Sequence, residues 1–162
     1  MAKPIPDGYH SITPNLTVSD GKKAVEFYKK AFGAKEVHVM LFPGSGKFMH
    51  AELEIGDSRF MLGEEMPEMQ CFSPLHYQGT PVGQYLYVKD CDKVFEQAVK
   101  AGATSVMSPE DMFWGDRCGA VKDPFGHKWS IATHKKDLTP QQMEEGAKKW
   151  TEQMSKKAPV AA

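Results

Sequence analysis

The chain has 162 residues, of which 41% are hydrophobic and 25% are charged, and its formal net charge is -1. This balance is typical of a globular domain with enough residues for one real core, and the near-neutral charge excludes the basic footprint of a nucleic-acid-binding protein. No apolar run is long enough for a membrane-spanning helix, and the N-terminal residues do not resemble a secretory signal. We therefore expect a cytoplasmic protein with neither a nucleic-acid partner nor a membrane partner.

The cysteines are few and widely spaced. Cys71, Cys91 and Cys118 are an odd set that matches neither a disulfide framework nor a CxxC metal knuckle. We expect three reduced thiols, which agrees with a cytoplasmic location. Cys118 stands next to a glycine, and we interpret it as a buried, inert thiol rather than a reactive one.

The sequence repeats itself once. Residues 18–39 read "VSDGKKAVEFYKKAFGAKEVHV", and residues 88–106 read "VKDCDKVFEQAVKAGATSV". Both contain Val-x-Asp, then Lys, an apolar-Glu step, Lys-Ala, Gly-Ala and a return to valine. The offset of about 70 residues indicates a duplicated module rather than a solenoid repeat.

Each copy predicts a strand followed by an amphipathic helix. Asp20 and Asp90 stand where the N-cap of a helix belongs, since an aspartate side chain accepts from the free amides of the first turn. Gly33 and Gly102 are expected to end the two helices in the left-handed conformation. In the first copy, one helix face is apolar at helical spacing. Its residues are Ala24, Val25, Tyr28, Ala31 and Phe32.

Three strands are expected after each helix. In the first half, "HVMLF", "KFMHAELEI" and "RFMLGEE" are separated by the turns "PGSG" and "GDS". In the second half, "TSVMS" leads through "MFWGD" to "GAVKD" and "KWSIATH", and "DPFG" has the composition of a type I turn. The sequence therefore predicts one domain with two strand-helix-three-strand modules, 9–66 and 81–135. Residues 67–80 between them are a linker or a loop over a cavity.

A further helix is predicted over residues 138–156. Thr139 and Gln142 form a capping box, with Pro140 at the first helical position. An apolar stripe follows at helical spacing. It consists of Met143, Ala147, Trp150 and Met154. This stripe either covers the core of the same chain or packs on a partner.

The order of these motifs resembles the vicinal oxygen chelate superfamily, which contains glyoxalases, bleomycin resistance proteins and extradiol dioxygenases. The segments "ITPNLTVSDGKKAVEFYKKAFGA", "MHAELEIGDSRFML" and "FWGDRCGAVKDPFGHKWSIATHKKDLTPQQM" are closest to its PhnB-like branch, and the resemblance covers residues 9–135. It implies an α+β fold in which two tandem βαβββ modules form a curled mixed-sheet cup. Helices would lie on the convex side and the site on the concave side.

The resemblance also implies where a metal would bind. Metal-dependent members carry His, Glu or Gln at four inward positions, which fall on Thr13, Met61, Gly83 and Ser130 in this chain. None of these four residues is a good ligand for a divalent metal, since zinc prefers thiolate, imidazole and carboxylate groups. We therefore expect no metal at the usual site and no cofactor, while a divalent metal elsewhere stays open.

Strand alternation then predicts which side chains face the cup. The expected ligand-binding residues are Phe48, His50, Tyr85, Tyr87, Trp114 and Arg117, with Glu52 beside His50. Such an aromatic lining with few polar groups fits a small, flat or partly apolar ligand.

Each of these side chains also has a structural interpretation. His50 and Glu52 either act as general base and orienting carboxylate or hold a displaced metal, or His50 simply hydrogen-bonds inside a polar interior and Glu52 is a solvated carboxylate on the strand face. Trp114 and the tyrosines are equally typical of a core. Asp116 with Arg117 could reach a ligand, but we expect the two to form an ion pair in the turn, and we expect His127 to cap the turn at 123–126.

Three functional hypotheses remain open at this point. The first is a small-molecule-binding protein of the glyoxalase/bleomycin-resistance type that uses the aromatic cup without a metal. The second is a lyase, isomerase or dioxygenase of the same fold with a displaced site around His50 and Glu52. The third is an interaction module without catalysis. Because members of the resembled family commonly dimerise and complete their cups across two chains, a homodimer is also expected.

Overall fold

The computed structural model describes residues 2–157 and has the predicted α+β architecture. The first module contains β1 (Asn15–Val18), α1 (Gly21–Phe32), β2 (Lys35–Leu41), β3 (Phe48–Ile55) and β4 (Ser58–Glu64). A short 3-10 turn, η1 (Pro67–Met69), follows in the linker. The second module contains β5 (Gly83–Tyr87), α2 (Cys91–Lys100), β6 (Thr104–Asp111), β7 (Asp116–Lys122) and β8 (Lys128–His134). The last element is α3 (Pro140–Lys157).

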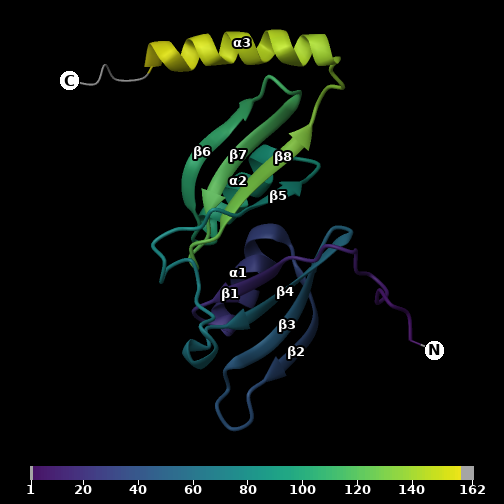
Figure 1. The fold of residues 1–162 in the computed structure, drawn as a ribbon, viewed down its shortest axis with the longest axis vertical. Helices are drawn as coiled ribbons and strands as arrows, with labels where there is room; N and C mark the ends of the chain where they lie inside the picture. The colour runs from purple at the N-terminus through teal and green to yellow at the C-terminus, as the bar shows by residue number, and fades with distance from the viewer. Residues whose placement is uncertain (1, 158–162) are drawn as a thin grey trace.

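Each module forms its own four-stranded mixed sheet. The orders are β1-β4-β3-β2 and β5-β8-β7-β6, so the first strand of each module lies beside its last strand. That pairing is parallel in both sheets, and the other pairings are antiparallel. Figure 1 shows the two modules one above the other, with α3 across the far end of the second sheet. The duplication seen in the sequence is therefore a duplication of topology.

The predicted helix ends agree with the structure at three of four positions. The side chains of Asp20 and Asp90 accept hydrogen bonds of 3.0 Å from the amides of Lys23 and Lys93. Gly33 ends α1 in the left-handed conformation at φ 68°. At α2 the C-cap is Ala101 in a right-handed conformation, and Gly102 follows with φ 116°. Local capping chemistry thus places both helices.

The two helices bring the modules together. The helix α1 packs on the first sheet, α2 packs on the second, and the two helices also contact each other. An aromatic cluster from both modules fills the space between them. Its members are Phe27, Tyr28, Phe32, Phe60, Phe125 and Trp129, with ring centroids 4.7 to 6.3 Å apart. The hydrophobic core is therefore shared by both halves of the chain.

A buried carboxylate lies at the edge of this cluster. Asp123, at the start of the predicted turn 123–126, is 2% exposed. Its oxygens accept hydrogen bonds from the Tyr28 hydroxyl (2.7 Å) and the Trp129 indole (3.0 Å), and from two backbone amides of its own turn (2.9 Å each). One of these amides belongs to His127, whose ring contacts the Thr17 carbonyl of β1 at 2.9 Å. His127 therefore has the structural role that its place in the turn predicts.

The C-terminal helix begins as predicted. Thr139 and Gln142 exchange two hydrogen bonds, of 2.9 and 3.2 Å, as a capping box requires. Its apolar stripe stays largely open, because Met143, Trp150 and Met154 are 37%, 44% and 49% exposed. Trp150 touches this chain through Phe113, at a ring distance of 5.9 Å. The alternative in which the stripe covers the chain's own core is therefore wrong.

Within residues 2–157, no helix has both the length and the apolar character needed to cross a bilayer.

We predict that Asp123→Ala lowers the free energy of unfolding by about 3–5 kcal/mol, since it leaves four buried donors without their charged acceptor. Urea titration followed by circular dichroism measures this difference. Asp57→Ala is the matched control, because Asp57 is exposed in the β3–β4 turn. A loss at Asp123 no larger than that at Asp57 would contradict the central role of this carboxylate.

Candidate functional site

Three of the predicted ligand-binding side chains meet on the face of the second sheet that points away from α2. Strand alternation in β5 puts Tyr85 and Tyr87 on this face, opposite the small residues Ser130 and Ala132 of β8. Both tyrosines therefore reach across β8 toward β7, where their hydroxyls donate to Asp116 Oδ2 at 3.2 and 3.0 Å. The Trp114 indole donates to the same oxygen at 3.2 Å.

Asp116 is the centre of this group, hereafter the Asp116 cluster. The residue is 3% exposed, although Tyr85 and Tyr87 above it are 48% and 61% exposed. Its second carboxylate oxygen contacts His134 Nδ1 at 2.8 Å, and His134 Nε2 contacts Asp137 at 3.1 Å. A buried anion is thus held by four side-chain donors, three of which are themselves open to solvent.

The carboxylate of Asp116 and the imidazole of His134 stabilise each other's charged form. Burial opposes ionisation of Asp116, but hydrogen bonds from His134, Tyr87, Tyr85 and Trp114 outweigh it, and the pKa of the carboxyl is lowered. Hydrogen bonds to Asp116 and Asp137 raise the pKa of His134 in return. The neighbouring Cys118 is 3% exposed, and burial raises the pKa of its thiol. Cys118 is therefore the inert thiol that we expected.

A cavity of about 680 Å³ adjoins the two tyrosines. It lies between the edge strand β5, the N-terminal segment and the β3–β4 turn. Its wall includes His10, Ile12, Arg59, Phe60, Tyr85, Tyr87, Lys89 and Trp129. Its size is within the range of small-molecule sites.

A second cavity, of about 640 Å³, lies under the linker. Asn15 and Thr17 of β1 line it together with Phe72, Tyr77 and His127. Part of the linker, between residues 72 and 80, thus contributes to the wall of this cavity.

His50 and Glu52 lie together on β3, on the face of the first sheet away from α1. His50 Nε2 is 3.2 Å from Glu52 Oε1. The buried Tyr9 hydroxyl completes no hydrogen bond among the described residues, but it lies close enough to the carboxylate to lower the pKa of Glu52, and His50 adds to this effect. Because the pair belongs to the first sheet and the Asp116 cluster to the second, the predicted lining residues form two separate groups.

Two of the predicted lining residues lie elsewhere. Phe48 packs against the core, and its ring leaves no room for a side chain at Gly21 in the first turn of α1. The cause is a β-bulge: Met40 pairs with His50 and Leu41 with Phe48, so Met49 is an extra residue in β3. The extra residue reverses the alternation on the N-terminal side of Met49, so the Phe48 side chain points toward α1 and not into the predicted lining.

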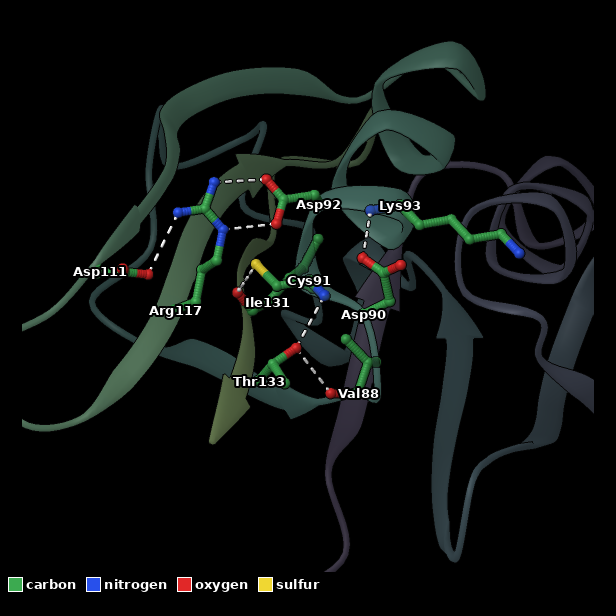
Figure 2. A network of polar contacts seen from close by, with 9 residues as sticks. All are labelled: Val88, Asp90, Cys91, Asp92, Lys93, Asp111, Arg117, Ile131 and Thr133. Atoms are coloured by element: carbon green, nitrogen blue, oxygen red, sulfur yellow. Dashed lines mark hydrogen bonds and ion pairs between the residues drawn. The ribbon is translucent and has the colours of Figure 1, made fainter. Parts of the chain in front are cut away.

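Arg117 lies on the opposite face of β7 from Asp116, so the expected ion pair between these neighbours is wrong. Its guanidinium binds Asp92 of α2 through two hydrogen bonds, of 2.5 and 2.6 Å, and Asp111 of β6 at 3.3 Å (Figure 2). Figure 2 also shows the Cys91 amide donating to Thr133 at 2.8 Å. These contacts fasten the first turn of α2 to the sheet, so Arg117 anchors a helix and does not face the cluster.

The side chains at the four positions that would carry a metal do not fit one. Met61 pairs with Asn15 in the β1–β4 ladder, while Gly83 pairs with Lys128 and Ser130 with Tyr85 in the β5–β8 ladder. Thr13 precedes β1 and donates to the His10 carbonyl. Among residues 2–157, no group of three or more His, Cys, Asp or Glu side chains is arranged to hold a metal ion.

Sequence reasoning missed the two residues that organise the cluster. The turn interpretation of Asp116 does not predict its central place, and no motif in the sequence points to His134. The alternation of side chains along a strand could have placed Asp116 on the same face as Cys118. The β7–β8 register then places His134 opposite Asp116.

The fold and the paired modules agree with comparisons to known proteins. A family model for the glyoxalase/bleomycin resistance protein/dioxygenase superfamily matches residues 9–131. The chain therefore belongs to this superfamily.

Individual relatives of known sequence or structure are similar to most of this chain. An uncharacterized protein of Mycobacterium bovis is 44% identical over 124 residues, which are 75% of this chain and 81% of that protein. The crystal structure of an Arabidopsis thaliana gene product has a TM-score of 0.62 at 31% identity and covers 76% of this chain and 98% of that one. The PhnB protein of Bacillus cereus has a TM-score of 0.60 at 18% identity, covering 76% and 99%, and so shares the fold.

We predict that His134→Gln lowers stability more in mild acid than in mild alkali. The folded pKa of His134 is raised above its unfolded value of about 6.5, so its stabilising contribution is complete below that value and is lost as the pH rises through the folded pKa. Urea unfolding of both proteins between about pH 5.5 and about pH 9 tests this. The same substitution in an Asp116→Asn background should show a smaller pH dependence. A stability difference that stays constant with pH would contradict the assignment.

Proposed function

We propose that this protein binds a small molecule at the Asp116 cluster and the adjoining cavity, without a metal ion. The observation that carries the proposal is the convergence of Tyr85, Tyr87 and Trp114 on one buried carboxylate, which fixes two exposed tyrosine rings and a half-buried indole in place. Rings that are pre-organised but solvent-exposed cost little entropy on binding and supply large contact area. Membership of a superfamily that includes bleomycin resistance proteins supports a binding function of this type.

An enzymatic function is supported by a separate observation. Glu52, with its lowered pKa, is an ionised partner for His50 Nε2 at 3.2 Å, which leaves Nδ1 as the basic nitrogen. This is the arrangement of a general base with its orienting carboxylate. The side chains of His50 and Glu52 are 32% and 23% exposed, respectively, yet they line neither of the two cavities described above. We therefore place catalysis at His50 second to binding at the Asp116 cluster.

We predict that a ligand found by screening aromatic compounds against tryptophan fluorescence loses about tenfold or more in affinity with Tyr87→Ala. The substitution removes one ring and one oxygen from the surface while leaving the core intact, since Tyr87 is 61% exposed. His50→Ala, in the other sheet, is the matched control and should bind the ligand normally.

The same two variants separate the alternatives. Binding that fails with His50→Ala and survives Tyr87→Ala would move the site to the first sheet and favour the enzyme. If no compound of a broad library binds, the interaction module is favoured and the binding function is rejected.

We also propose a homodimer that uses the apolar stripe of α3. The exposed side chains of Met143, Trp150 and Met154 on one face of the helix support this proposal.

We predict that Trp150→Glu with Met154→Glu shifts the mass in sedimentation equilibrium from dimer to monomer. Lys149→Glu, on the polar part of the same helix, is the control. A wild-type monomer, or a double variant that remains dimeric, would contradict the proposal.

A further inference from the structure

The side chains of the Asp116 cluster have already committed their protons. Tyr85 and Tyr87 each have one hydroxyl proton, Trp114 has one indole proton, and all three are donated to Asp116 Oδ2. His134 faces Asp116 through Nδ1 and Asp137 through Nε2. None of these four side chains has a hydrogen-bond donor left for a ligand.

The parts of these side chains that remain available are electron-rich. Each tyrosine oxygen keeps its lone pairs, and the rings of Tyr85 and Tyr87 lie 5.1 Å apart at an angle of 50°. Aromatic faces carry partial negative charge and attract cations and polarised N–H groups. The exposed side chains of Tyr85 and Tyr87 therefore offer a ligand hydrogen-bond acceptors and aromatic faces, but no hydrogen-bond donor.

The charges around the rings act in the same direction. Asp116 lies buried beneath the tyrosines, and Asp137 is fully exposed at the edge of the cluster. His134 is the one cationic partner of these two carboxylates within the cluster. The negative faces of these rings thus lie beside two carboxylates and one histidine, whose fixed charges sum to a negative value.

We infer that the ligand of this site presents a flat, positively charged nitrogen group, such as an amidinium or an aromatic ammonium, to Tyr85, Tyr87 and Trp114. The inference rests on the proposed binding function and adds the chemical class of the ligand. The cation would lie against the ring faces, and its N–H groups would donate to the tyrosine oxygens.

The adjoining cavity also carries positive charge, and the test must separate its effect from that of the rings. Arg59 and Lys89 line this cavity, and Lys89 follows Tyr87 by only two residues. The Arg59 guanidinium is already engaged, with Glu54 at 3.4 Å and the Asp7 carbonyl at 3.0 Å. A ligand held mainly by these two cations would be an anion, which is the opposite preference.

Three probes of nearly equal shape decide between these preferences: benzamidinium, neutral benzamide and anionic benzoate. The readout is the indole N–H resonance of Trp114 in a proton–nitrogen NMR spectrum of the full chain, assigned with Trp114→Phe. Trp129 is the internal control, because its indole is bound to Asp123 and its side chain is 5% exposed. We expect benzamidinium to shift the Trp114 resonance with an affinity about tenfold higher than benzamide, and benzoate to have no effect.

Two substitutions test the source of the preference. Tyr87→Phe keeps the ring and removes one acceptor oxygen, and Asp116→Asn removes the buried charge, so both should reduce the preference for benzamidinium over benzamide. Asp92→Asn, at the Arg117 contact with α2, is the matched control and should leave it unchanged. An unchanged Trp129 resonance shows in each case that the variant is folded.

The possible failures are distinguishable. Equal or tighter binding of benzamide or benzoate at Trp114 would overturn the cationic class while leaving a binding site in place. If benzamidinium, benzamide, benzoate and the screened library all leave the Trp114 resonance unmoved, the proposed binding function fails as well.

Discussion

The hydrogen bonds to the buried carboxylate of Asp123 join the two halves of this protein. Tyr28 of α1 and Trp129 of β8 both donate to it, so one side chain connects the helix of the first module to the last strand of the second. A buried anion with four donors tolerates few other arrangements, because each unmatched group would cost free energy. The β7–β8 hairpin is thereby held in one place against the shared aromatic core.

The same hairpin carries the candidate site at its other end. Asp123 lies in the turn between β7 and β8, while Asp116 and His134 form a pair at the open end of the two strands. Both aspartates collect tyrosine and tryptophan donors. They differ in exposure: Tyr28 at Asp123 is fully buried, whereas Tyr87 at Asp116 is 61% exposed. One network therefore holds the core, and the other presents rings to solvent.

Membership of the superfamily explains the fold but does not decide the chemistry. The positions at which metal-dependent members carry ligands are Thr13, Met61, Gly83 and Ser130 here, and none of these side chains suits a divalent metal. The functional argument therefore depends on the side chains that the strands bring together, as it must for any fold that serves several activities. In this chain those side chains surround Asp116.

Local sequence patterns determined much of this structure. Asp20, Asp90 and the turn 123–126 stand where the sequence predicts them, because capping and turn formation involve neighbours within a few residues. Tyr85 and Tyr87 share a face for the equally local reason of strand alternation. Only the tertiary structure decided that Phe48 turns to α1 because of a bulge at Met49, that Arg117 binds Asp92 25 residues away, and that donors from β5, the β6–β7 hairpin and β8 converge on Asp116. Such contacts depend on which strands become neighbours, and residue spacing along the chain does not contain that information.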